Sequence, residues 1–522
     1  MESLNDLDEL LLGGGIVERS GSSMSSTGGL AFLHILADES KEIPIPLSGF
    51  STSGWTIETM HGFWCWMENP FTNNKGTIRA DGEWELFYKR ISVLNSILSE
   101  AAIVTQKKEQ EKAQLSRILG ECYYLRAWNY FMLANIYGLP YDKNNLNDAG
   151  SVTLKLDAKI EETQFGRNHT GEVYNQIISD LKQAISYLKA GDNLGSKLHA
   201  TEASAWALLS RVYLYMEEYQ LAIQAADSVK GYKLYDIVNN YTPGSGESFL
   251  TVANPEIIHV QGKQMMSTVH PGTGYRKSTY GSWPDENGNI VTGYKYSGVV
   301  LCTAYGVSNE LAALFDENDA RYSAFFTLSF GANHLVGRKY RAILSKEILE
   351  TDPVTRDTVE PLAKGNDFNE SCAIRYAEVV LNKAEAQACL GDAGAVETMR
   401  SFLATRYYTA PEIPTSSDAL IEFIRQERYK ELCFEGHRWF DLRRYAVNTA
   451  HKQAISVTHE WHTKVSSYVV TASGYNTLKP YDEEVKGDWV LPVPEDVIDY
   501  CFPVLTNFER AKGIVKTKYE EQ

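Results

Sequence analysis

The sequence predicts a mainly α-helical fold, a bundle of tetratricopeptide-repeat helix pairs joined to an irregular, loop-rich lobe that contains short strands. Three observations support this prediction. Apolar residues recur with a helical period over long stretches between Trp84 and Leu188. Two further passages have the pattern of two short helices joined by a tight turn, with small residues that let the helices approach closely. The passage between these pairs, Lys230–Asn369, is rich in Gly, Tyr, Ser, Thr and Asn instead.

The N-terminal part of the chain is mixed in character. Leu4–Leu12 and Leu30–Leu36 are predicted as short helices, and Gly13–Gly29 is predicted as a loop because it is rich in Gly and Ser. Ser48–Asn74 is long, aromatic and without a regular period. We therefore place these residues in the irregular lobe.

Three long helices follow. Apolar residues at helical spacing predict one helix around Trp84–Leu98 and a second over residues 108–137, which ends before the helix stop at Gly138 and Pro140. Thr170 is a candidate N-cap for the third helix, and Gly191 closes it.

The two helix pairs come next. Thr201–Met216 and Gln220–Val229 form the first pair, with a tight turn between them. Ala377–Tyr407 has the same layout, with a helix end at Gly391. A matching arrangement at two places favours a tetratricopeptide repeat, and a generic helical hairpin remains the alternative.

The C-terminal part contains the densest pattern in the chain. Asp418 is predicted to cap a helix that leads into IRQERYKELCFEGHRWFDLRRY (Ile424–Tyr445), where charged and aromatic residues alternate at helical spacing. Val447–Tyr481 then turns polar and strand-like. We predict one domain over residues 1–522, with the helical repeat core at 83–230 and 374–446 and the irregular lobe and loops at 1–82, 231–373 and 447–522.

Charge and cysteine usage restrict the possible partners. The formal net charge of −17 argues against nucleic acid, and against polyanionic ligands unless one local patch is basic. The seven cysteines form no C-x-x-C pair and are interpreted mostly as small buried apolar residues. No apolar run is long enough to span a membrane, and the N-terminus lacks the basic and apolar regions of a signal peptide.

Several segments, in order, resemble the SusD/RagB family of outer-membrane nutrient-binding lipoproteins. The matching segments are ECYYLRAWNYFMLANIYGLPY (121–141), ISDLKQAISYL (178–188), LAALFDENDARYSAFF (311–326), IRYAEVVLNKAEAQACLGD (374–392), ERYKELCFEGHRWFDLRR (427–444) and LPVPEDVID (491–499) followed by Asn507. The resemblance covers most of the chain. It implies a helical bundle built on tetratricopeptide pairs with a more irregular lobe docked on it.

The resemblance also implies a function. Such proteins bind an oligosaccharide or polysaccharide at the cell surface without catalysis and deliver it to a TonB-dependent, SusC-like transporter of the outer membrane. The implied location is the outer membrane, facing outward, through a lipid anchor. The lipobox cysteine that carries such an anchor is missing from this sequence, so the anchor is inferred from the family alone.

The charged residues of the matching helices are interpreted as structural. A charge that is taken out of water between packed helices must be paired. We therefore expect ion pairs at the following residues, which stand beside aromatic side chains: Arg126, Glu427, Arg428, Glu431, Glu435, Arg438, Asp441 and Arg443. A catalytic role for Glu435 or Asp441 is the less favoured reading.

Two stretches of aromatics without helical period are the candidate ligand-binding regions. Sugars present flat C–H faces that stack on exposed aromatic rings and hydroxyl rims that bind polar groups. The candidates are Trp55, Trp64 and Trp66 in residues 49–71, and Tyr275, Arg276, Tyr280, Trp283, Tyr294 and Tyr296 in residues 272–296. Trp64 and Trp66 point the same way if their segment is a strand. The alternative is that these rings fill a small core within the irregular lobe, or contact a partner.

No other motif points to a reaction. HEWH (residues 459–462) lacks the spacing of a zinc-binding H-E-x-x-H motif, and no phosphate-binding or dinucleotide-binding loop occurs. We expect no catalytic residue, no metal and no cofactor. Three alternatives to glycan capture remain open: capture of a peptide or glycoprotein by the same fold, a glycan-cleaving enzyme, and an assembly scaffold without a small ligand.

Overall fold

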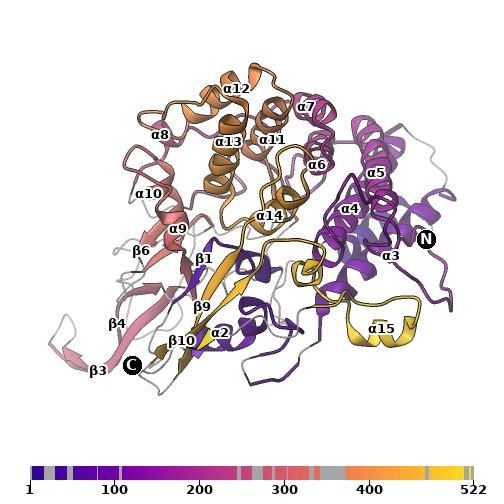
Figure 1. The fold of residues 1–522 in the computed structure, drawn as a ribbon. Coiled ribbons are helices and arrows are strands. Elements are labelled where there is room, and N and C mark those ends of the chain that lie inside the picture. The colour runs from indigo at the N-terminus through magenta and orange to yellow at the C-terminus, as the bar shows by residue number, and fades with distance from the viewer. Residues whose placement is uncertain are drawn as a thin grey trace.

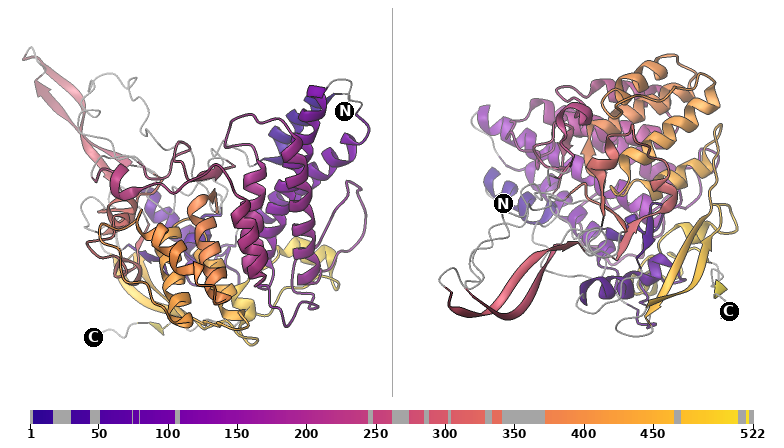
Figure 2. Two further views of the ribbon diagram at one scale, coloured as in Figure 1. Left: turned by 90° about the horizontal axis from the view of Figure 1, so that it is seen from above. Right: turned by 90° about the vertical axis from the view of Figure 1, so that its left-hand side faces the viewer.

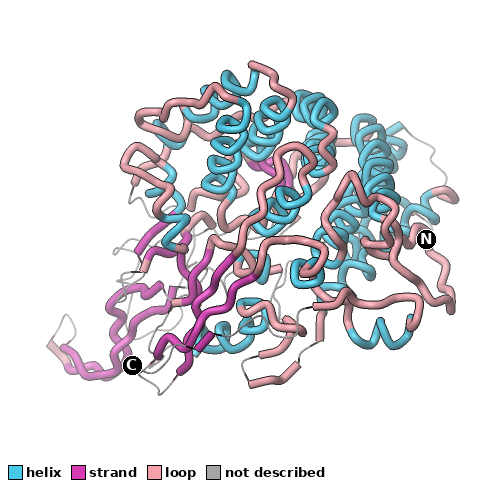
Figure 3. The backbone as a smooth tube through the Cα atoms, viewed as in Figure 1, coloured by secondary structure: helices cyan, strands magenta, loops and turns pink. Residues whose placement is uncertain are grey.

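The fold is a helical array joined to a lobe of short antiparallel strands (Figure 1). The computed structural model describes residues 3–16, 30–43, 51–73, 75–78, 80–104, 109–243, 248–261, 274–284, 288–301, 304–328, 334–340, 372–464, 470–510 and 517–518. Within them, helices gather in one half of the molecule and most strands in the other (Figure 3). The predicted fold class is therefore confirmed. None of the described helices combines the length and the apolar character that crossing a membrane requires.

The helical array is continuous in space although the lobe interrupts it in sequence. Its helices are α3 (Gly82–Ala101), α4 (Glu109–Tyr137), α5 (Thr170–Ala190), α6 (Glu202–Tyr215), α7 (Tyr219–Ser228), α11 (Tyr376–Cys389), α12 (Gly394–Leu403), α13 (Ser417–Leu432) and α14 (Arg438–Val447). Each of α3 to α7 packs on the next, and α11 returns from the lobe to pack on α6 and α7. Both predicted helix pairs, α6–α7 and α11–α12, are present.

Small residues and left-handed turns build these pairs. Ala207 and Ala222 are buried where α6 meets α7. Glu217 ends α6 with a φ of 58°, and Gly391 ends α11 with a φ of 70°. A φ in this range costs a residue with a side chain more than it costs glycine, so the first turn depends on other contacts. The Glu217 carboxylate supplies one of them by accepting the Thr449 N–H at 3.0 Å.

The C-terminal end of α4 is closed by residues from distant parts of the chain. The last carbonyls of a helix lack partners within the helix and must find them elsewhere. Here the donors are Arg443 to Asn135 O and Gly138 O, the Leu491 N–H to Ile136 O (2.9 Å), and Arg167 to Tyr137 O (2.8 Å). Burial lowers the pKa of Arg443 to about 10. No carboxylate of the described residues pairs with Arg443. The negative end of the α4 dipole compensates the charge of this arginine instead.

The charge-dense segment Ile424–Tyr445 is two helices, which corrects the prediction of one. α13 ends at Leu432 and α14 begins at Arg438. Between them Phe434 has a φ of 59° and Gly436 a φ of 81°, so the chain leaves the helical path at this point. Two helix starts also differ slightly from prediction: the N-caps are His169 for α5 and Ser416 for α13.

The lobe consists of short antiparallel sheets. The pairs are β1 (Ser40–Glu42) with β5 (Tyr305–Val307), β2 (Ile257–His259) with β8 (Ile374–Arg375), β3 (Gly274–Pro284) with β4 (Ile290–Leu301), β6 (Phe326–Leu328) with β7 (Leu335–Gly337), and β10 (Val470–Leu478) with both β9 (Val457–Lys464) and β11 (Thr517–Lys518). The predicted short strands are therefore present. The ribbon of β3 and β4 projects away from the rest of the molecule (Figure 2).

Short helical elements complete the described chain. They are α1 (Leu4–Leu10), a π-helical turn at Leu11–Gly15, a 3-10 turn at Ala31–His34, α2 (Ser51–Trp64), α8 (Ile237–Asn240), α9 (Asn309–Ala312), α10 (Arg321–Phe325), a 3-10 turn at Lys486–Trp489, and α15 (Glu495–Cys501). The helix α2 corrects the prediction of an irregular segment over Ser48–Asn74.

Candidate ligand-binding site

The second aromatic stretch forms the projecting ribbon of β3 and β4. Its register places Tyr280 opposite Tyr294, Ser278 opposite Tyr296, and Trp283 opposite Val291. Directly opposed positions of an antiparallel pair lie on the same face of the ribbon. The backbone thus brings the positions of three predicted tyrosines to one face of one element.

The structure describes only the backbone at these ribbon positions. The side chains of Tyr275, Arg276, Tyr280, Trp283, Tyr294 and Tyr296 lie outside the described residues, as do Asp285 and Asn287 entirely. Near the tip, Ile290 is exposed, and the hydroxyls of Ser282 and Thr292 lie 2.8 Å apart across the strands. The assignment of these residues to a ligand site stays a prediction.

The first aromatic stretch is helical, and two of its candidates are buried. Trp64 is the last residue of α2 and Trp66 lies two residues later with a φ of 45°, so the segment is not a strand and the condition for a shared direction of the two rings is not met. Both side chains are only 1% exposed. The indole of Trp64 donates to Glu460 O at 2.8 Å and that of Trp66 to Leu36 O at 3.1 Å. The backbone of Trp55 lies in α2, and its side chain lies outside the described residues.

A histidine fills the space between the two buried indoles. The His459 ring stacks on Trp64 at 3.7 Å between centroids and on Trp66 at 4.2 Å. Burial lowers the pKa of His459 to about 4, so the ring is neutral at neutral pH. The indole faces of Trp64 and Trp66 that stack on His459 are therefore covered by protein. Trp64 and Trp66 fit the alternative of a core within the lobe, which corrects their prediction as ligand-facing rings.

The HEWH segment does not assemble a metal site. His459 lies in the aromatic stack, and His462 Nδ1 lies 3.1 Å from the buried carboxylate of Glu42. Among the residues that the structure describes, no group of three His, Cys, Asp or Glu side chains could hold a metal ion. The segment is strand β9, and its alternate side chains serve packing and one ion pair.

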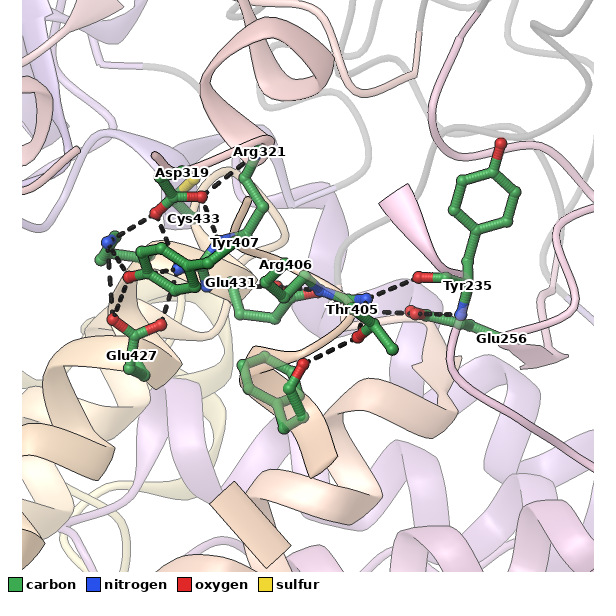
Figure 4. Close-up of polar contacts among 12 residues, drawn as sticks. Tyr235, Glu256, Asp319, Arg321, Thr405, Arg406, Tyr407, Glu427, Glu431 and Cys433 are labelled. Carbon is green, nitrogen blue, oxygen red and sulfur yellow. Dashed lines mark hydrogen bonds and ion pairs between the residues drawn. The ribbon is translucent and has the colours of Figure 1, made fainter. Parts of the chain in front are cut away.

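The charges of α13 form a buried network with residues from the lobe and the array (Figure 4). Glu431 Oε1 accepts from Arg375 at 2.7 Å and from Arg406 at 2.9 Å. Burial alone raises the pKa of this carboxyl, but Arg406 and Arg375 outweigh it and hold the pKa far below its usual range. Glu435 accepts from Arg375 and from Lys339, each at 2.7 Å.

The network continues to α10 and to the end of α12. Arg321 donates to Glu427 at 2.6 Å and to Asp319 at 2.8 Å, and Figure 4 shows these groups together with the Tyr407 hydroxyl. That hydroxyl donates to the other oxygen of Glu427 at 2.6 Å. Lys430 lies 2.6 Å from Asp319. The sequence indicated the charges on α13 but not these partners, which lie far away in the chain.

A second network holds α14 to α11 and α13. Asp441 accepts from Arg428 at 2.9 Å and from Arg444 at 2.7 Å. Glu385 on α11 accepts from Arg444 at 2.6 Å and from Arg425 at 3.0 Å. Burial raises the pKa of Glu385, but these arginines outweigh it and lower the pKa to about 2.

The ion-pair prediction is thus confirmed in most cases. Two further predicted residues have carboxylate partners outside α13 and α14: Arg126 pairs with Asp180 and Arg438 with Asp38, each at 2.7 Å. Arg443 is the exception, because it caps α4 instead.

Two buried carboxyls that the sequence did not single out have raised pKa values. Glu39 is fully buried, and burial raises its pKa to about 8, against the opposing effect of the Phe434 N–H that it accepts at 3.1 Å. Burial raises the pKa of Asp81 to about 7, although it accepts from the Tyr137 hydroxyl at 2.6 Å. Asp81 is also the N-cap of α3. Both carboxyls lie in packed surroundings, so we assign them structural roles.

Comparison with known proteins adds independent information. A family model described as "Starch-binding associating with outer membrane" matches residues 48–214, and the model of the SusD family matches residues 314–507. A SusD-like protein of Formosa agariphila is 25% identical over 408 residues, which cover 72% of this chain and 74% of that protein. A SusD-like protein of Bacteroides ovatus is 24% identical over 398 residues, which cover 69% of this chain and 64% of that protein.

Solved structures show the same fold. A putative sugar-binding protein of Bacteroides vulgatus superposes with a TM-score of 0.66 at 20% identity, over 97% of this chain and 98% of that one. A SusD superfamily protein of Bacteroides thetaiotaomicron gives 0.64 at 20% identity, over 97% and 100%. A laminarin-binding SusD-like protein gives 0.59 at 20% identity, over 97% and 99%. The family models, the relatives and the fold agree with one another and with the sequence motifs. The chain belongs to the SusD/RagB family.

Proposed function

We propose that the protein binds an oligosaccharide or polysaccharide at the cell surface, without catalysis, and delivers it to a SusC-like, TonB-dependent transporter. The description of the matching family model supports glycan binding and an outer-membrane location. The sugar-binding and laminarin-binding structural neighbours support it as well. A lipid anchor holds the protein at the outer membrane in this proposal, and the helical array packs against the transporter.

The observation that carries the ligand site is the projecting ribbon of β3 and β4. A two-stranded ribbon that stands apart buries little surface of its own, so ligand contacts can use its residues without disturbing a core. The opposed positions Tyr280 and Tyr294, with position Tyr296 two residues further along β4, lie on one face of it. Aromatic rings stack on the C–H faces of sugars. We therefore place the ligand at the ribbon rather than at Trp64 and Trp66.

The ion pairs and the burial of Glu435 and Asp441 support the proposal that the protein is not catalytic. Glycoside hydrolysis uses two carboxyl groups on either side of a bound sugar, one of them free to give up a proton. Glu435 is held by Arg375 and Lys339, and Asp441 by Arg428 and Arg444. These carboxylates are less than 3% exposed and so have no access to a substrate.

Affinity electrophoresis against a panel of neutral polysaccharides, with release of reducing sugar assayed in parallel, tests the proposal. We expect retardation by at least one glycan and no sugar release. Tyr280→Ala and Tyr294→Ala should each weaken binding of that glycan by about fivefold, since a ring contact contributes about 1 kcal/mol.

Tyr408→Ala is the matched control, because this tyrosine is 55% exposed on the helical array, away from the ribbon. It should leave binding unchanged. Release of reducing sugar would contradict the non-catalytic proposal. Retardation by glycoproteins or peptides alone would replace the glycan by a peptide ligand, and retardation that is equal in all variants would move the site away from the ribbon.

A further inference from the structure

Two surface hollows of the helical array adjoin each other and share Lys230 and Tyr232. One has a volume of about 500 Å³ and is lined by residues of α7, the chain after it, α11 and α12. The other has a volume of about 450 Å³ and lies between the end of α5 and the start of α6. Together they form one groove, which we call the array groove.

Three lysines of the array groove have no carboxylate partner within the part of the chain that the structure describes. Lys230 and Lys233 line the first hollow, and Lys189 and Lys230 line the second. All three are exposed, and no carboxylate among the residues that the structure describes lies within ion-pair distance of them. Lys383, in the first hollow, differs because its Nζ lies 2.6 Å from Asp227.

The acidic groups of the groove are mostly engaged. Asp227 binds Lys383, and Asp192 accepts from Arg117 at 3.0 Å. Glu202 accepts from the Trp206 indole at 3.3 Å and has no cationic partner among the residues that the structure describes. The groove therefore carries three unpaired positive charges against one negative charge. This is the reverse of the whole chain, whose formal net charge is −17.

An excess of positive charge at one place on an acidic protein favours the binding of a negatively charged ligand at that place. The field of the whole chain repels anions, so an anion binds only where nearby cations outweigh that field. The groove also offers two half-buried rings, Tyr232 and Tyr376, with the hydroxyl side chains of Thr398, Ser401 and Thr405 beside them. Rings, hydroxyls and cations together match a sugar that carries a carboxylate.

We propose that the array groove is a second glycan subsite, separate from the ribbon, that takes a carboxylate-bearing sugar such as a uronic acid residue. The choice of a glycan rests on the proposed function, while the anionic preference rests on the lysines. Lys230 lies at the junction of both hollows and contacts the carboxylate, with Lys189 and Lys233 on either side.

A pair of ligands that differ only in charge tests this subsite. Binding of a soluble polyuronate and of its methyl ester is measured by titration calorimetry at low and high salt. We expect the polyuronate to bind more tightly than the ester, and the difference to shrink at high salt because exposed charges are screened. Each exposed ion pair changes an equilibrium by up to about fivefold, so the double variant Lys230→Gln with Lys233→Gln should lose about tenfold in affinity for the polyuronate.

The pair Lys383→Gln with Asp227→Asn is the control in the same hollow, because it removes one positive and one negative charge that pair with each other, and it should change the affinity less than twofold. Equal binding of polyuronate and ester by the wild type, or an unchanged affinity of the double variant, would overturn the proposal. Tighter binding of polyglutamate than of polyuronate would also overturn it, in favour of an acidic peptide. Binding of neutral glycans by the same samples reports on the proposed function separately, since the double variant keeps the ribbon intact.

Discussion

Two buried glutamates show how partners decide the pKa of a carboxyl in this protein. Glu39 and Glu431 are both fully buried, and burial raises the pKa of each. Glu431 faces Arg375 and Arg406 at hydrogen-bonding distance, so it stays ionised. Glu39 accepts one backbone N–H and has Asp38 beside it, so the effect of burial prevails. Glu39 is therefore mostly protonated at neutral pH.

Replacing Glu39 by glutamine should make stability less dependent on pH. The pKa of Glu39 rises from its ordinary 4.5 to about 8 on folding, so its protonated form stabilises the fold. This contribution is complete below about pH 4.5 and is lost as the pH rises towards 8. Glutamine imitates the protonated form at every pH. In urea unfolding from pH 5 to 8, the unfolding free energy of Glu39→Gln should fall less steeply than that of the wild type, by about 1.4 kcal/mol per pH unit.

Glu483→Gln on the exposed surface serves as the control, and it should keep the wild-type slope. Identical slopes for Glu39→Gln and the wild type would mean that Glu39 is ionised in the folded protein throughout this range.

The sequence predicted the ion pairing of charged residues correctly but not the burial of two tryptophans, and both outcomes have a physical reason. Arg428 and Asp441 were predicted to be paired because charges among packed aromatics have no other stable state. Trp64 and Trp66 were predicted to face a ligand because their neighbours show no regular pattern. Their stacking partner, His459, lies almost 400 positions away. No local pattern reports such a contact, so the burial of these rings could not be predicted from the sequence.

At the scale of elements, α13 is held by buried charges in addition to an apolar face, whose Leu420, Ile421 and Ile424 join the core of α11 and α12. Its side chains reach the lobe through Arg321 and Arg375, and the repeat helices through Arg406. A buried ion pair adds little stability compared with an apolar contact, but removing one partner is costly because the other charge stays buried. Such a helix therefore specifies one arrangement of its neighbours.

Glu431→Gln should be strongly destabilising. The change leaves Arg375, Arg406 and Arg321 with an excess of buried positive charge, and the expected loss of unfolding free energy is about 3–5 kcal/mol. Chemical denaturation measures it. Glu422→Gln lies on the exposed face of the same helix and should change stability by less than about 0.5 kcal/mol. A loss below about 1 kcal/mol for Glu431→Gln would show that the network relaxes around the missing charge.

At the scale of the whole molecule, one apolar core joins the array to the N-terminal and C-terminal parts of the lobe. This core includes Phe87 and Leu125 of the array together with Trp64 and Trp489 of the lobe. The ribbon of β3 and β4 projects from the body (Figure 2). The proposed ligand site at the ribbon therefore lies apart from the core that stabilises the fold.

Deletion of the ribbon should separate binding from stability. Replacing residues 276–299 by a short Asn-Gly turn should shift the thermal midpoint by only a few degrees, since the ribbon packs little on the body. Glycan retardation in affinity gels should be lost. A large fall in the thermal midpoint would show that the ribbon is part of the fold, and unchanged retardation would place the ligand elsewhere.

Periodicity was sufficient to find the array but not the lobe. The helices α3 to α7, α11 and α12 follow from apolar spacing and small residues, which act within one or two turns. The break between α13 and α14 was missed, since Gly436 stands in a segment whose other residues favour a helix. The position of the ribbon was missed as well, because strand pairing fixes the register and not the direction in which an isolated hairpin leaves the body.

The closing of α4 by Arg443 and Leu491 has a consequence for the order in which the protein is made. When α4 leaves the ribosome, more than 300 residues of the chain are still to be synthesised, including both of these donors. Contacts between such distant positions form late. The array therefore cannot be completed on a nascent chain until the tail has appeared.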